Sequence, residues 1–139
     1  MASYNKFNVF VSDIATKVHN LNSDTLKIML TNTAPVATNT VKSNITEISS
    51  GNGYTAGGTQ AVFSSGNNTS GTYKLILSPV VYTASGGSIG PYQYAVLYNS
   101  TPASGNLIAW WDYGTALTLT NGNSFTVSLD QTGGVFTLV

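Results

Sequence analysis

The sequence predicts a mainly β protein: an antiparallel β-sandwich or barrel, jelly-roll-like, of about eight short strands with one N-terminal α-helix. From Thr25 onward, apolar residues alternate at period two, as they do in half-buried strands. Clusters of Gly, Asn, Ser and Thr break these runs at spacings of roughly 8–12 residues, which is typical of such folds. Before Thr25 the apolar period is helical. Because 139 residues suit one domain, we expect a single domain over 1–139, with the helix at about 4–19 and the β-sandwich at about 25–139.

The helix prediction rests on an apolar stripe between Tyr4 and His19. Its residues recur at spacings of three and four, the period of one helix face. A helix this short is marginal alone, so the stripe packs on the sheet or docks partly on a neighbouring copy or another protein. We expect His19 to be exposed at the helix end. The candidate partner-contact residues are Phe7, Phe10, Val11, Ile14 and Val18.

Residues Pro91–Tyr113 hold both tryptophans and predict a β-hairpin. Two aromatic-rich runs at period two flank a turn of Ser, Thr, Pro, Gly and Asn. The second run is apolar on both faces up to Asp112, so we expect a central, buried strand. Trp110 and Trp111 should point to opposite faces of that strand. The expected structural core residues are Tyr94, Val96, Leu107, Ala109 and Trp111.

The other strands are shorter and are separated by turn residues. The Asn121-Gly122 pair predicts that the strands on either side of it form a hairpin. The glycine-rich segment 51–58 is expected to be an irregular loop. The C-terminal strand is uncharged, so it has few features that would prevent its edge from pairing with another chain. Ile45–Ile48 is expected to be a short strand or a turn. The other expected strands are Thr25–Leu30, Ala61–Ser64, Thr72–Leu77, Val80–Thr83, Ala116–Thr120, Ser124–Asp130 and Val135–Val139.

Charge is scarce in this chain. Only 7% of the residues are charged, against about 25% in ordinary soluble domains. The five basic residues are all lysines, so we expect neither nucleic-acid binding nor attachment to an anionic membrane surface. A neutral surface does little to keep copies apart, which favours association. Without cysteine the chain has no disulfide or thiolate chemistry, and we expect no signal peptide or membrane span.

Few residues could carry catalysis. Gly51–Ala56 matches a dinucleotide-binding pattern and Gly86–Gly90 matches the nucleophile elbow, but no helical pattern follows either. Asp112, beside the tryptophans, could help to hold a sugar ring or could cap a strand end. One histidine and no Asp-x-Asp run make a metal site unexpected. We therefore expect no enzymatic activity, no cofactor and no metal.

Long stretches of the chain resemble a family of small tailed-bacteriophage virion proteins. These stretches are NKFNVFVSDIATKVHNLNSDTLKIMLTNTAPVATNT, ITEISSGNGYTAGG, GTYKLIL with GGSIGPYQYAVLYN, and LIAWWDYG with LTLTNGNSFTV. They cover nearly the whole chain in the same order. The resemblance implies a virion structural protein, and it favours a capsid decoration, or cement, protein that bridges capsomers on the outside of the head.

The resemblance also implies partners and a location. The implied partner is the major capsid protein, with the chain forming a homo-oligomer, a trimer being favoured. The implied location is the capsid surface of the virion, after synthesis in the host cytoplasm. One alternative is another virion component, in the tail or neck. The other is a carbohydrate-binding module or adhesin, suggested by Trp110, Trp111 and Tyr113. No catalytic residues come with the resemblance.

Overall fold

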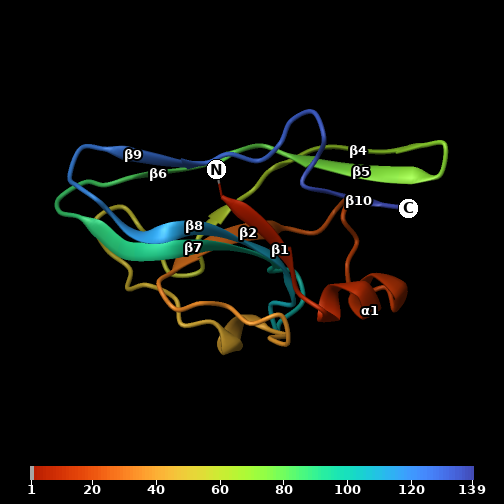
Figure 1. Ribbon diagram of the computed structural model, residues 1–139, viewed down its shortest axis with the longest axis horizontal. Coiled ribbons are helices and arrows are strands. Elements are labelled where there is room, and N and C mark those ends of the chain that lie inside the picture. The colour runs from red at the N-terminus through yellow and green to blue at the C-terminus, as the bar shows by residue number, and fades with distance from the viewer. Residues whose placement is uncertain (1) are drawn as a thin grey trace.

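The computed structural model describes residues 2–139 and confirms a mainly β fold (Figure 1). Across these residues there are ten strands, and every strand pairing is antiparallel, as the sequence predicts. The helical elements are α1 (Val9–Ala15) and the short 3-10 helix η1 (Lys42–Asn44). The strands are β1 (Ser3–Lys6), β2 (Leu26–Thr31), β3 (Thr59–Gln60), β4 (Phe63–Thr69), β5 (Thr72–Leu77), β6 (Val80–Thr83), β7 (Ile89–Asn99), β8 (Leu107–Leu119), β9 (Ser124–Val127) and β10 (Phe136–Leu138).

Two layers of strands face each other in Figure 1. One layer is a five-stranded sheet in the order β1-β8-β7-β2-β3. The other layer holds a three-stranded sheet, β10-β5-β4, and a two-stranded sheet, β6-β9. Apolar side chains from both layers fill the space between them, among them Leu30 and Leu97 from the first and Leu77, Val80 and Val127 from the second. The fold is therefore like a β-sandwich, held together by burial of these inward faces.

The Pro91–Tyr113 hairpin forms β7 and β8, which pair antiparallel with Val96 opposite Trp110. Strand β8 lies between β1 and β7, so it is a central strand as expected. Tyr94 is only half-buried, because it lies beyond the side chains that cover Val96 on the same face. The expected core residues that are buried are Val96, Leu107, Ala109 and Trp111.

A second apolar cluster covers the outer face of the five-stranded sheet. Met29, Val96 and Leu107 from three neighbouring strands are fully buried there. Phe7 and Ile45, from the segments that cross this face, complete the cluster. The strands β2, β7 and β8 are thus apolar on both faces because both faces are covered.

The predicted helix over Tyr4–His19 is wrong in its extent. Residues Ser3–Lys6 form strand β1, and only Val9–Ala15 are helical. Strand β1 pairs with β8, from Ser3 opposite Asp112 to Lys6 opposite Ala109, and so satisfies backbone groups of β8 that would otherwise lie at an open edge. This pairing joins segments about a hundred residues apart, and a local period cannot reveal it. Beyond the helix, Lys17 adopts a φ of 67°, the left-handed conformation that commonly ends helices.

The predicted hairpin at Asn121-Gly122 is also wrong. Residues 116–119 belong to β8, and β9 pairs with β6 instead of folding back on β8. The Gly122 N–H donates to the Ala84 carbonyl at 2.8 Å, and the Ala84 N–H donates to the Asn123 carbonyl at 2.9 Å. These two bonds attach the turn to the end of β6, so the chain crosses from one layer to the other.

The structure decides between strand and turn at residues 45–48 and moves one other predicted strand. Residues 45–48 contain only an isolated bridge, between Thr31 and Glu47. The strand expected at Ala61–Ser64 is shifted to Phe63–Thr69, because the polar residues that follow pair with β5. Within residues 2–139, no helix is long and apolar enough to cross a membrane.

Candidate interaction surface

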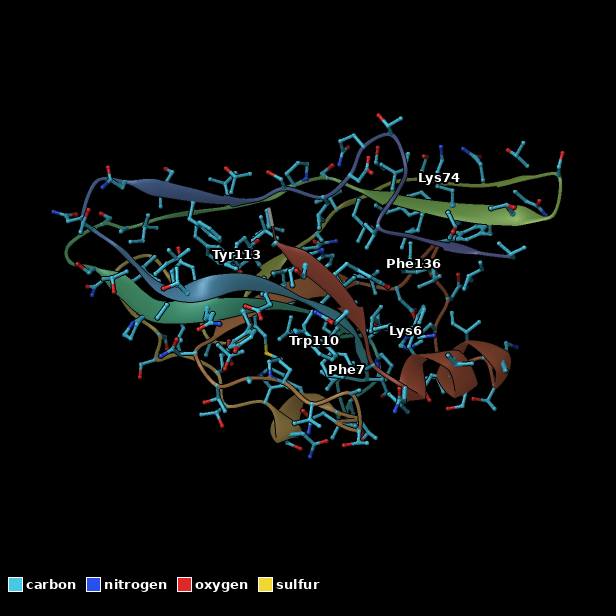
Figure 2. All side chains as sticks on the ribbon, viewed as in Figure 1. Lys6, Phe7, Lys74, Trp110, Tyr113 and Phe136 are labelled. Atoms are coloured by element: carbon cyan, nitrogen blue, oxygen red, sulfur yellow. The ribbon has the colours of Figure 1, made fainter. Side chains whose placement is uncertain are left out.

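An apolar groove, here called the edge groove, opens between the end strands of two sheets. Strand β1 ends the five-stranded sheet and β10 ends the three-stranded sheet. The groove has a volume of about 540 Å³. Figure 2 labels one residue from each side of it, Lys6 on β1 and Phe136 on β10. The lining residues are Tyr4, Lys6, Phe10, Val11, Ile14, Val135, Phe136, Thr137 and Leu138.

Helix α1 supplies three of the five candidate partner-contact residues to this groove: Phe10, Val11 and Ile14. Phe10 is nearly fully buried, and its ring centroid lies 4.9 Å from that of Phe136 in an edge-to-face arrangement. This contact joins the helix to β10. Val11 is 56% exposed and Ile14 is half-buried, so both are accessible at the groove.

The other two members of the stripe lie elsewhere. Phe7 is fully buried in the outer cluster, 4.5 Å from the ring of Trp110, and it cannot contact a partner. Val18 is half-buried and lines a neighbouring hollow together with His19. The stripe divides because the chain changes from strand to helix between Lys6 and Val9, so its members no longer share one helical face.

The walls of the edge groove present backbone groups as well as apolar side chains. Among residues 2–139, β1 pairs only with β8 and β10 pairs only with β5. The outer edge of each strand therefore carries free N–H and C=O groups. Lys6 is the one charged residue in the described lining. Apolar side chains beside free strand edges are suited to an extended protein segment.

Six lining residues lie outside α1. Tyr4 and Lys6 were not expected at a contact surface, whereas Val135, Phe136, Thr137 and Leu138 belong to the C-terminal strand that was expected to be open to pairing. The alternation of Phe136, Thr137 and Leu138 could have indicated one apolar face for the last strand. No local signal could have found Tyr4 and Lys6, because their position depends on the pairing of β1 with β8.

His19 is buried, which corrects the expectation of an exposed helix-end residue. Its Nδ1 accepts a hydrogen bond from the Asn99 side-chain amide at 3.0 Å, and the same amide donates to Asp24 at 2.6 Å. Its Nε2 lies 3.8 Å from Asp13 Oδ2 and has no hydrogen-bond partner among the described residues. Burial lowers the pKa of His19, and the charges of Asp13 and Asp24 oppose that shift.

This polar cluster attaches the helix to the main sheet. Asp13, on α1, accepts a hydrogen bond from the Asn106 side chain at 2.9 Å, and Asn106 immediately precedes β8. Asn99 is the last residue of β7. The cluster therefore links α1 and the segment after it to both ends of the β7–β8 turn, and it holds the helical wall of the edge groove in place.

A second polar network, centred on Glu47, supports the glycine-rich loop 51–58. Glu47 Oε1 accepts hydrogen bonds from the Tyr54 hydroxyl at 2.6 Å and from the Gly57 N–H at 2.5 Å. The Tyr54 hydroxyl accepts in turn from the Leu30 N–H at 3.0 Å. Tyr82 donates to the Ile28 carbonyl, and burial raises the pKa of Tyr82 to about 12. Both tyrosines stay protonated. Tyr54 fixes the loop against β2 and Tyr82 ties β6 to β2, so this network is structural.

The aromatic residues around Asp112 do not share a surface. Trp111 is 8% exposed and lies in the core between the layers, whereas Trp110 packs against Phe7 on the opposite face. Tyr113 packs edge-to-face on Phe125, with ring centroids 5.1 Å apart. Asp112 accepts from Gln93 at 3.1 Å and from the Gly114 N–H at 2.7 Å, and these bonds lower its pKa. Asp112 thus stabilises β8 at the point where its pairing with β7 shifts in register.

The glycine motifs have structural roles. The loop at Gly51–Ala56 is not followed by a helix, and its Asn52 side chain donates to the Ser88 carbonyl at 2.9 Å. This bond joins the two glycine-rich segments. Gly90 lies inside β7, so the second motif does not lead into a helix either. Residues 2–139 contain no group of three His, Cys, Asp or Glu side chains that could hold a metal ion.

Comparisons of the chain with protein-family models, with curated proteins and with solved structures gave no match.

Proposed function

We propose that this protein is a structural component of a tailed-bacteriophage virion, and specifically a capsid decoration protein that binds the major capsid protein on the outside of the head. The proposal combines the sequence resemblance with the kind of surface that the fold offers. In this role the chain acts as a rigid block whose many weak contacts are multiplied by the symmetry of the shell.

The observation that carries the proposal is the edge groove. Its apolar lining and two free strand edges suit contact with protein, and Lys6 is the one titratable cation in the described lining. Asp112, the acid in the aromatic segment, accepts hydrogen bonds from Gln93 on β7 and from the Gly114 N–H on β8. Both observations favour an assembly role over a catalytic one.

A second supporting feature is the rigidity of the scaffold. Both faces of the central strands β2, β7 and β8 are covered by apolar side chains. The glycine-rich loop 51–58 is held by the Glu47 network. A block of this kind loses little conformational entropy on binding, which favours attachment through modest contacts.

The proposal is tested by sedimentation with phage heads assembled without this protein. Purified protein mixed with such heads should pellet with them and reach saturation at a fixed number of copies per capsid. Purified tails, mixed in parallel, distinguish the head from a tail location. Protein that stays wholly in the supernatant with heads, or that pellets only with tails, would refute the capsid assignment.

A further inference from the structure

We propose that the edge groove is a self-association surface, in which β10 of one copy pairs antiparallel with β10 of a second copy about a two-fold axis at Thr137. The two three-stranded sheets then join into one continuous sheet. This inference names a second copy as the protein that occupies β10, so it narrows the protein contact from which the capsid assignment is argued, and it is tested on purified protein alone.

Strand β10 is an open edge whose one protection against pairing is its length of three residues. Proteins protect edge strands with charges, prolines, bulges or very short strands. Within the described residues, the opposite end of the same sheet, β4, has a register shift between Phe63 and Ser65, and the far end of the five-stranded sheet, β3, has only two residues. Strand β10 is uncharged, contains no proline and has regular pairing with β5.

Strand β10 is complementary to itself. In an antiparallel pair centred on Thr137, each Phe136 lies opposite the partner copy's Leu138, and the two Thr137 residues lie opposite each other. Aromatic–aliphatic and Thr–Thr cross-strand pairs both stabilise antiparallel sheets. Thr137 is exposed, while Phe136 and Leu138 are half-buried toward the groove. The pairing would thus extend an existing apolar face.

The charge of the edge groove also suits a second copy. The described lining of the edge groove has a single charged residue, Lys6, and no carboxylate, so it does not select an acidic or a basic segment. The chain has a net charge of +0 and only 7% charged residues, so two copies repel each other little. An uncharged strand such as β10 of a second copy matches this groove.

Two exposed apolar side chains at the groove also favour a second copy of the chain as its occupant. Tyr4 is 41% exposed on β1 and Val11 is 56% exposed on α1. A second copy seated along β10 would lie beside both and reduce their exposure. Because the contact is isologous, the same burial occurs on each of the two copies. A two-fold pairing gives a dimer, in place of the trimer that the sequence resemblance implies.

The test uses single cysteines, because the natural chain has none. Thr137→Cys should form a disulfide-linked dimer under mild oxidation, since equivalent residues on a two-fold antiparallel pair lie close together. Thr126→Cys is the matched control, because Thr126 is an exposed threonine on β9, in another sheet. Failure of Thr137→Cys to cross-link, or equal cross-linking of Thr126→Cys, would overturn the proposal.

A second measurement keeps the result independent of cysteine chemistry. Sedimentation equilibrium of the natural chain should show a concentration-dependent dimer, and Thr137→Lys should raise its dissociation constant about fivefold, because it places like charges opposite each other. Thr126→Lys should leave the constant unchanged, and circular dichroism checks that both variants fold. A monomer at all concentrations, a trimer, or an unaffected dimer in Thr137→Lys would each refute this pairing and leave capsid binding to be decided by its own assay.

Discussion

Replacing Tyr54 with Phe removes the hydroxyl that connects β2 to the Glu47 network. That hydroxyl donates to Glu47 Oε1 at 2.6 Å and accepts from the Leu30 N–H at 3.0 Å. Burial raises the pKa of Tyr54 well above its ordinary value, so the group is protonated and donates at every pH at which the protein is handled. The Tyr54→Phe variant keeps the ring and its contact with Tyr82, and it loses only the two hydrogen bonds.

The expected loss can be worked out from these two bonds. Leu30 is fully buried, so its N–H loses its partner where water cannot replace it, which costs about 1–3 kcal/mol. The hydrogen bond to a carboxylate is worth about 1.5–3 kcal/mol, but Glu47 keeps the Gly57 N–H as a partner and part of this energy is retained. We therefore expect the free energy of unfolding to fall by about 2–4 kcal/mol. For a chain of this size that corresponds to a decrease in Tm of roughly 6–12 °C.

The measurement is urea denaturation followed by circular dichroism, with Tyr94→Phe as the matched control. Tyr94 is half-buried and lies outside the Glu47 network, so its variant should change the free energy of unfolding by less than about 0.5 kcal/mol. A Tyr54→Phe variant as stable as the natural chain, or equal losses in both variants, would show that this network does not anchor the loop.

Three further predictions follow from the core and the polar cluster. His19 has a folded-state pKa below its ordinary 6.5, so the unfolded chain binds a proton first as the pH falls below 6.5. The free energy of unfolding should therefore reach its full value above that pH and decrease below it by at most about 1.4 kcal/mol per pH unit. In urea denaturation at several pH values, His19→Gln should flatten this part of the profile. Gly58→Ala should cost at least about 1–3 kcal/mol, because Gly58 has a φ of +75° and an added Cβ would lie 1.9 Å from the Ile28 carbonyl oxygen; an unchanged thermal midpoint would contradict this. Phe10→Ala should cost about 3–5 kcal/mol and Val11→Ala less than about 0.5 kcal/mol, because only the first is buried, and similar losses in denaturant would show that the stripe is not divided in this way.

Local patterns were sufficient for the β7–β8 hairpin. Alternation, aromatic content and a polar turn all act over neighbouring residues, and the pairing they indicate is between adjacent segments. The same patterns indicated that Trp110 and Trp111 point to opposite faces, and the structure places them in different clusters. The half-buried state of Tyr94 could not be predicted, because it depends on how far the outer cluster extends across the sheet.

The edge groove was only partly visible in the sequence. The stripe indicated Phe10, Val11 and Ile14, and the uncharged C-terminal strand was expected to be a weakly guarded edge. Their meeting in one groove depends on the contact between Phe10 and Phe136, which lie at opposite ends of the chain. The periodicity of each segment shows its own apolar face, but it does not identify the distant segment that the face contacts.

The sequence by itself determined the class of fold, the central hairpin and the scarcity of charge, because side-chain alternation and composition are properties of neighbouring residues and of the chain as a whole. The tertiary structure alone decided which strands pair. It assigned Ser3–Lys6 to the edge of β8 and β9 to β6, and it buried His19 between Asp13 and Asn99. In each case a backbone or polar group gains a partner from a distant segment, and that gain outweighs the local preference of the sequence.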